Sequence, residues 1–165
     1  MRNPLPAAPA FTAGSILLLL TLPCVALAQG SSTRYVNPPG LVKPTGYTHV
    51  VIAPDGRTVY IAGQVAFDSA GAVVGEGDFA KQAEQVYRNL ERALQSVGGT
   101  MTDLVKTTTF VTDIKNLPSL REVRSRRLSK TQPPANTLLQ VSSLARPELL
   151  IEIEAVAIIS RIIRQ

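Results

Sequence analysis

The sequence predicts one α+β domain in which two helices cover a single face of one β-sheet. The chain has 165 residues, of which 45% are hydrophobic and 18% are charged, and these values are typical of one packed globular domain. Runs rich in β-branched residues alternate with two segments of helical periodicity, in the order β-β-(β)-α-β-α-β-β. Because two helices can cover only one face of the sheet, its other face must meet water, a ligand or another subunit.

Residues 1–28 are predicted to be a secretory signal peptide that is cleaved after Ala28. Arg2 precedes a short apolar run at 15–22, and Ala26-Leu27-Ala28 supplies the small residues that a signal peptidase reads. An uncleaved membrane anchor and a lipid anchor on Cys24 are the alternatives. Cleavage predicts a periplasmic or secreted protein that contains no cysteine, and no metal or organic cofactor is expected in it.

Residues 29–46, which are rich in proline and glycine, are predicted to form an extended arm over a domain of residues 47–165. The domain is expected to begin with strands at 47–52 and 58–62. The turn residues Pro54-Asp55-Gly56 between them predict that these two strands pair as a hairpin. A further strand is expected at 64–68.

Two helices are predicted in the rest of the domain. Asp78 is a suitable N-cap for the first helix, whose apolar residues recur every 3.6 residues until Gly98-Gly99 ends it. The second helix is expected over residues 117–130, before Pro133-Pro134. The remaining strands are expected at 104–112, 137–141 and 149–159.

The formal net charge of +5 is concentrated in one short segment. Residues 121–130 hold five basic residues and one acidic residue. Such a run is usually the solvated face of a helix, and a surface for RNA or another anion is the less favoured interpretation. The chain has no tryptophan and few other aromatic residues on which bases could stack, so we expect no nucleic-acid partner.

The last strand carries the candidate catalytic groups. In Ile151-Glu152-Ile153-Glu154, strand alternation places both glutamates on one face and both isoleucines on the other, under the helices. The sequence shows no nucleophile–base pair, phosphate-binding loop or metal-ligand cluster, which leaves a carboxylate on the open face as a general acid or base. His49 is explained at least as well by a structural role as by a catalytic one.

Five segments form a joint pattern, in order within residues 35–160: Arg57–Gln64, Gln82–Leu94, Asp103–Asp113, Pro133-Pro134-Ala135 and Ile151–Ala157. Together they resemble the YjgF/YER057c/UK114 family, also called the RidA or reactive-intermediate deaminase family. The resemblance implies a chorismate-mutase-like fold with a mixed sheet, and a homotrimer with small-molecule clefts between its subunits. It also implies cofactor-free hydrolysis of imines such as 2-iminobutanoate or 2-iminopropanoate to the 2-oxo acid and ammonia.

The resemblance also assigns roles to five residues. It implies that Glu152 positions the attacking water, that Tyr47 lines the cleft, and that the backbone of Gly63 approaches the substrate. Leu138 falls where the family contributes a backbone group. Asn136 stands where deaminating members have the arginine that clamps the substrate carboxylate. Because asparagine lacks the charge and planar fork of arginine, we expect weak hydrolysis of 2-imino acids or an altered substrate.

Two other functions remain open at the level of the sequence. The chain could be a non-catalytic trimeric protein of the periplasm that keeps the cleft only to hold a small molecule. A ribonuclease-type activity is the second alternative, and it requires the basic segment at 121–130 to be functional.

Overall fold

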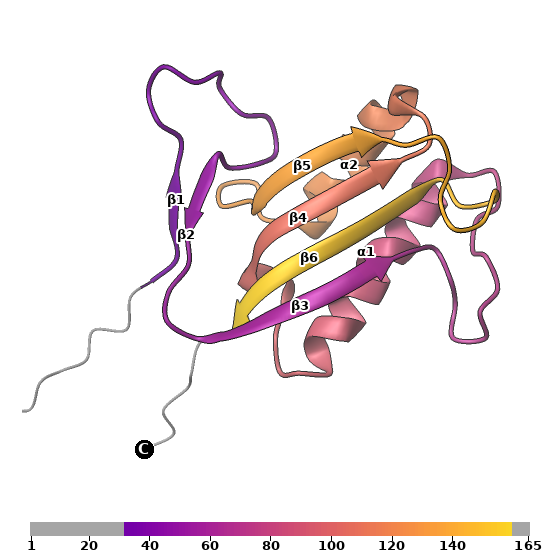
Figure 1. The fold of residues 1–165 in the computed structure, drawn as a ribbon, viewed down its shortest axis with the longest axis horizontal. Helices are drawn as coiled ribbons and strands as arrows, with labels where there is room; N and C mark the ends of the chain where they lie inside the picture. The colour runs from indigo at the N-terminus through magenta and orange to yellow at the C-terminus, as the bar shows by residue number, and fades with distance from the viewer. Residues whose placement is uncertain (1–31, 160–165) are drawn as a thin grey trace, which may run out of the picture.

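The structure, a computed structural model, describes residues 32–159 and contains two sheets and two α-helices in that range (Figure 1). Short 3-10 turns at Met101–Asp103 and Ile114–Asn116 precede β4 and α2. The helices are α1 (Phe79–Gln95) and α2 (Leu117–Arg127). The strands are β1 (Arg34–Val36), β2 (Val50–Ile52), β3 (Arg57–Gln64), β4 (Leu104–Val111), β5 (Ala135–Gln140) and β6 (Ile151–Ile159).

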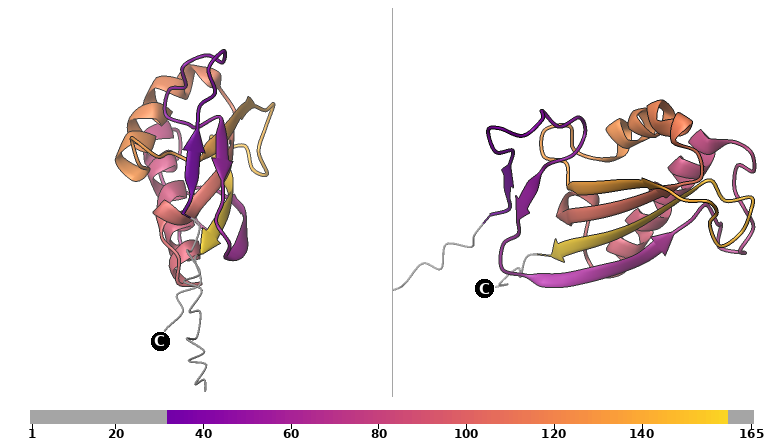
Figure 2. Two further views of the ribbon diagram at one scale, coloured as in Figure 1. Left: turned by 90° about the vertical axis from the view of Figure 1, so that its left-hand side faces the viewer. Right: turned by 45° about the horizontal axis from the view of Figure 1, so that its top comes forward.

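Four strands form the main sheet, in the order β3-β6-β4-β5. The interior strand β6 is antiparallel to both β3 and β4, whereas β4 and β5 are parallel. Both helices lie on one face of this sheet, and Figure 2 shows the other face free of them. The predicted α+β fold, with a mixed sheet and two helices on one face, is confirmed.

The hydrophobic core lies between the helices and the main sheet. Ile151 and Ile153 point from β6 into this core and are fully buried. Leu90 and Leu94 of α1 are also fully buried and lie one helical turn apart. Burying one such side chain contributes roughly 1.5–3 kcal/mol, so the contact between helix and sheet supplies much of the driving force for folding.

The ends of α1 confirm the predicted capping signals. The Asp78 side chain accepts a hydrogen bond from the backbone N–H of Lys81 at 3.1 Å, as expected of an N-cap. The helix ends at Gln95, and Gly98 follows with a φ of 77°, a conformation that favours glycine. Helix α2 ends at Arg127 rather than at the predicted residue 130, because Leu128 adopts extended backbone.

The predicted hairpin between residues 47–52 and 58–62 is wrong. β2 pairs with β1, which lies within the predicted arm, whereas β3 pairs with β6. The turn at Pro54-Asp55-Gly56 therefore leads from the small sheet to the main sheet. β6 offers nine residues as a partner for the eight of β3, a longer pairing than the three-residue β2 could provide.

The strand predicted at 64–68 is also absent from the described part of the chain. β3 extends through Gln64, and beyond it Phe67 and Val73 form only an isolated bridge. The predicted signal peptide at 1–28 lies outside the described residues. Within residues 32–159, no helix combines the length and hydrophobicity needed to cross a membrane.

Candidate functional site

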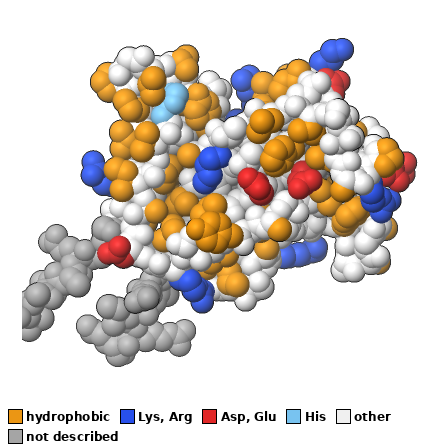
Figure 3. Space-filling model, in the orientation of Figure 1, with side chains coloured by type: hydrophobic (Ala, Val, Ile, Leu, Met, Phe, Trp, Pro, Cys, Tyr) orange, Lys and Arg blue, Asp and Glu red, His pale blue; other side chains and the backbone are white. Residues whose placement is uncertain are grey.

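The helix-free face of the main sheet carries the two glutamates of β6. Glu152 lies opposite Phe110 of β4, and Glu154 lies opposite Thr108. Figure 3 shows acidic and basic side chains near the middle of this face, surrounded by hydrophobic side chains. The shared face of the two glutamates agrees with the alternation in the sequence, which also buries Ile151 and Ile153 on the opposite side.

Gly63 and Glu152 are in direct contact at the end of β3. The pairing of β3 with β6 shifts register between Ile61 and Gln64, and this irregularity brings the Gly63 backbone against the carboxylate. A Cβ atom at position 63 would overlap the carboxylate, because it would lie 2.7 Å from Cδ of Glu152 and 3.0 Å from Cγ. Glycine at this position therefore allows the carboxylate to lie against the main chain.

Asn136 is on the opposite face of the sheet from Glu152. It is in register with Thr107, and the Thr107 and Thr109 hydroxyls donate to its Oδ1 at 2.9 and 3.2 Å. These threonines are buried on the helix-covered side, so the amide also points there. The N–H groups of the amide make no hydrogen bond to any residue within 32–159, which leaves them available as donors.

Asn136 and Glu152 are also separated along the sheet. Phe110 is in register with both Glu152 and Leu139, so Leu139 of β5 lies at the same position along the strand direction as Glu152 of β6. Asn136 precedes Leu139 by three residues, which corresponds to about 10 Å at ~3.3 Å per residue. One protomer therefore does not bring together the two residues that the resemblance places in one site.

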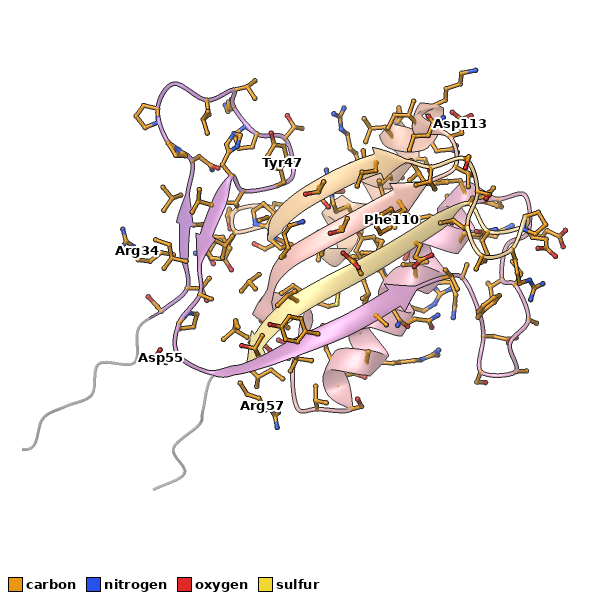
Figure 4. The ribbon with its side chains drawn as sticks, in the orientation of Figure 1. Arg34, Tyr47, Asp55, Arg57, Phe110 and Asp113 are labelled. Carbon is orange, nitrogen blue, oxygen red and sulfur yellow. The ribbon has the colours of Figure 1, made fainter. Side chains whose placement is uncertain are left out.

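Tyr47 lies beside the start of β5, as Figure 4 shows. The adjacent Thr48 fixes this position, since its backbone N–H donates to the Pro134 carbonyl at 3.3 Å and its hydroxyl donates to the Pro133 carbonyl at 2.7 Å. Thr48 also forms a parallel bridge with Ala135, the residue before Asn136. Tyr47 and Asn136 are therefore neighbours at the start of β5.

His49 holds the N-terminal arm in place. Its Nε2 lies 2.8 Å from the Val42 carbonyl, and its backbone N–H donates to Oδ1 of Asn37 at 2.9 Å. Its ring also makes an edge contact with the Tyr47 ring, at 5.3 Å between centroids. These contacts are those of a structural residue that orders the segment before Tyr47.

Leu138 presents its side chain to the core side of β5. It is in register with Thr109 and is partly buried against the hydrophobic core. Its side chain is therefore engaged in packing, while its backbone belongs to β5, the edge strand of the main sheet. This placement is compatible with a contribution from the main chain, the role that the resemblance implies.

The sequence reasoning missed Lys106, a third charged residue on the open face. Its ammonium group donates to the Thr107 carbonyl at 2.8 Å and to the Thr137 hydroxyl at 3.0 Å. Together with Tyr60 and Glu154 it lines a hollow of about 410 Å³. Burial lowers the pKa of Lys106, and the nearby Glu154 carboxylate partly offsets this effect. Applying strand alternation to 104–111 would have placed Lys106 on the same face as Phe110.

The candidate site residues thus form two separate groups in one protomer. Glu152 and Gly63 lie where β6 begins and β3 ends, whereas Tyr47 and Asn136 lie where β5 begins. Neither group includes Leu138, whose side chain packs in the core. Within the described range, no cluster of three or more His, Cys, Asp or Glu residues is arranged to hold a metal ion.

Comparison with known proteins identifies relatives over most of the chain. The sequence model of one family, described as Endoribonuclease L-PSP, matches residues 41–159. One relative is the 2-iminobutanoate/2-iminopropanoate deaminase of Homo sapiens, which is 34% identical over 120 residues. This match covers 73% of the present chain and 83% of the human protein.

Solved structures show the same fold. A protein of the Rid family from Yersinia pestis, described as of unknown function, matches with a TM-score of 0.73 and 38% identity over 78% of this chain and 100% of that chain. A member of the YjgF/YER057c/UK114 family from Mycobacterium tuberculosis matches with a TM-score of 0.54 and 32% identity, covering 69% of this chain and 87% of that chain. The fold is therefore α+β of the chorismate-mutase-like type.

Proposed function

Because the chain belongs to the Endoribonuclease L-PSP family, which includes the YjgF/YER057c/UK114 and RidA proteins, we propose that it is a cofactor-independent hydrolase of reactive imines or enamines. The contact between Glu152 and Gly63 carries this proposal, since it holds a carboxylate against the main chain on the open sheet face. The name of the human relative, a 2-iminobutanoate/2-iminopropanoate deaminase, supports the class of reaction.

In the proposed reaction, Glu152 acts first as a general base and then as a general acid. Its carboxylate takes a proton from water while the water oxygen attacks the carbon of the C=N bond. The protonated carboxyl group then returns the proton to the nitrogen of the tetrahedral intermediate. The carboxylate then carries the remaining hydroxyl proton to the nitrogen as the C–N bond breaks and the C=O bond forms, so the products are ammonia and a carbonyl compound. Water supplies the oxygen, and no electrons are transferred.

Asn136 limits the substrates that this site can hold well. Loss of one partner of a buried charge pair costs about 2–5 kcal/mol, which corresponds to roughly 30-fold to several-thousand-fold in affinity or rate. The free N–H groups of Asn136 can still donate to a neutral oxygen acceptor. We therefore expect the wild-type protein to hydrolyse 2-iminopropanoate slowly and to favour an imine that does not depend on a carboxylate clamp.

We also propose that the complete site forms between subunits of a homotrimer. The separation of the two residue groups supports this, because the β5 edge of one subunit, which carries Tyr47 and Asn136, would meet the open sheet face of the next, which carries Glu152 and Gly63. The open sheet face offers a surface for such contacts: Tyr60 is 80% exposed and Leu139 is 40% exposed. Closed cyclic assembly would bury this face equally in every subunit.

The proposal is tested with imines that are generated in solution. An amino-acid oxidase acting on a panel of amino acids supplies 2-imino acids, and an amine oxidase supplies imines without a carboxylate. The measurement is the rate at which ammonia is released with and without the protein. We expect acceleration for at least one imine, loss of that acceleration in Glu152→Gln, and retention in the matched variant Glu154→Gln.

Two results would contradict the hydrolase. If no imine in either panel is hydrolysed faster than in buffer, the non-catalytic binding protein replaces the enzyme as the better explanation. If Glu152→Gln and Glu154→Gln are equally active, the chemistry does not depend on the carboxylate beside Gly63. A ribonuclease assay on the same preparations tests the remaining alternative, which the lack of an aromatic stacking surface disfavours.

A further inference from the structure

The basic segment 121–130 divides into two parts in the structure. Arg126 and Arg127 donate to the Glu84 carboxylate at 2.9 and 2.7 Å. Arg126 also pairs with Glu122 at 2.7 Å. The charges of these two arginines are therefore balanced by carboxylates of the chain itself, and they account for part of the basic run.

The other cations of the segment surround a small hollow. Arg121, Arg124 and Lys130 line a space of about 220 Å³ where the end of α2 meets the loop at Thr45 and Gly46. None of its lining residues belongs to the two groups described above. The remaining lining residues, two hydroxyl-bearing and one apolar, are Ser125, Ser129 and Leu128.

Arg124 is a buried cation that has no anionic partner among residues 32–159. The residue is only 8% exposed, and its guanidinium makes one hydrogen bond in the structure, from Nη2 to the Thr45 carbonyl at 3.3 Å. Burial raises the pKa of the nearby Tyr87, so that phenol stays neutral and provides no counter-charge. Burial also lowers the pKa of Arg124, and the charge of Arg121 adds to this. A buried charge without a partner is destabilising.

The loop before Tyr47 is shaped around the guanidinium. Gly46 has a φ of 74°, and a Cβ atom there would lie 2.7 Å from Nη2 and 3.2 Å from Cζ of Arg124. The main chain therefore passes directly over the guanidinium without contributing a carboxylate. Arg124 lines the hollow, and only one of its five N–H groups donates to a residue within 32–159. Nη1 and the second N–H of Nη2 form a planar fork, which fits two oxygens of one anion.

We propose that this hollow, lined by Arg124, Arg121 and Lys130, binds a small oxyanion, the carboxylate or phosphate group of a small molecule. Arg124 would hold two oxygens of the group, and the cations at the rim would add long-range attraction. The carbonyl end of α2 lies at the same place and weakens anion binding, so the three side-chain cations must carry the recognition. The site is independent of the proposed hydrolysis.

The test compares anions at constant ionic strength. The melting temperature of the protein is measured while chloride is replaced by inorganic phosphate or by acetate, since an anion that binds the folded state raises it. We expect one of the two anions to raise the melting temperature, and its identity assigns the ligand class. Arg124→Gln should raise the anion concentration needed for the same increase in melting temperature by about tenfold or more. Lys130→Gln should raise this concentration less.

The matched control is Arg34→Gln, which removes one exposed cation of β1 and should respond like the wild type. The melting temperature in chloride alone shows whether Arg124 serves to bind anions or to stabilise the fold. If Arg124 is kept for binding, Arg124→Gln in chloride should be at least as stable as the wild type, because it removes an unpaired buried charge. A large loss of stability in chloride, or equal anion responses in Arg124→Gln and Arg34→Gln, would overturn the proposal.

Discussion

In the proposed site, Asn136 is the residue that would limit how strongly a substrate carboxylate is held at the start of β5. The variant Asn136→Arg should raise hydrolysis of 2-iminopropanoate by about tenfold or more, since its guanidinium offers two charge-assisted hydrogen bonds that together exceed ~1.4 kcal/mol. It must also give up the hydrogen bonds from Thr107 and Thr109, which a flexible side chain at the edge strand can do by turning away from the core. Ammonia release at limiting substrate measures the gain.

The double variant Asn136→Arg with Glu152→Gln is the control for this gain. An amide cannot accept a proton from the attacking water, so the added activity should disappear while the fold and assembly remain. A folded Asn136→Arg protein that gains no activity would show that the site has diverged at more than this residue, and would favour the binding protein. High wild-type activity would require another residue to hold the carboxylate.

At this scale, strand alternation predicted which face each residue of β6 occupies but not which residues of different strands meet. The pair of Glu152 with Gly63 depends on a register shift that no local pattern reveals. The orientation of Asn136 depends on its register against Thr107 of β4, a partner that is distant in the sequence. The burial of Arg124 likewise depends on the loop that carries Gly46.

The contact between the two helices should depend on pH. Burial disfavours the ionised form of Glu84, but hydrogen bonds from Arg126 and Arg127 outweigh this and lower the pKa of Glu84 below its usual 4.5. The stabilisation is therefore complete above pH 4.5 and is lost as the pH falls through the lower, folded-state value. Glu84→Gln should reduce the free energy of unfolding by about 1–2 kcal/mol at pH 7 and by progressively less in acid.

Urea unfolding across this pH range measures the effect. Glu91→Gln is the matched control, because Glu91 lies on the same helix and forms no ion pair within the described residues. The expected difference between the two variants shrinks toward low pH. If Glu84→Gln lowers the free energy of unfolding by the same amount at pH 7 and in acid, Glu84 acts through packing and not through its charge.

Helix α1 was predictable because the signals that define it are local: the Asp78 cap, the spacing of apolar residues and the glycines after its end. The pairing of strands was less predictable. A turn sequence such as Pro54-Asp55-Gly56 favours a hairpin, but the neighbours that a strand pairs with depend on the whole sheet. β3 has a longer partner in β6, and β2 has its partner in the arm.

At the scale of the whole molecule, the open sheet face should be the contact between subunits. Light scattering on the processed protein should give the mass of three chains of about 137 residues at micromolar concentration. Tyr60→Glu places a charge on the most exposed aromatic residue of this face and should shift the mass toward that of one chain. Val42→Glu, at an exposed position of the arm, should leave the assembly unchanged. A monomer mass for the unmodified protein would contradict both the trimer and the site between subunits.

Processing of the N-terminus is tested separately. The apolar run and Ala26-Leu27-Ala28 predict that the periplasmic protein begins at Gln29. Intact-mass measurement on the periplasmic fraction should give this product, and Ala28→Asp should leave the precursor uncut because the peptidase reads a small residue there. Retention of Met1 in the wild type, or a lipid on Cys24, would contradict the prediction.

The interior place of β6 links the timing of folding to the end of the chain. Arg57 pairs with Ile159, so the pairing of β3 with β6 joins residues that lie far apart in the sequence. The chain must lose the entropy of closing this large loop before the hydrogen bonds between the two strands can stabilise the sheet. A chain that still lacks residues 151–159, whether on the ribosome or within a translocase, leaves β3 without its partner and β4 with an open edge. We expect such a chain to stay unfolded until β6 has been made, which is the state that the predicted export through a narrow channel would require.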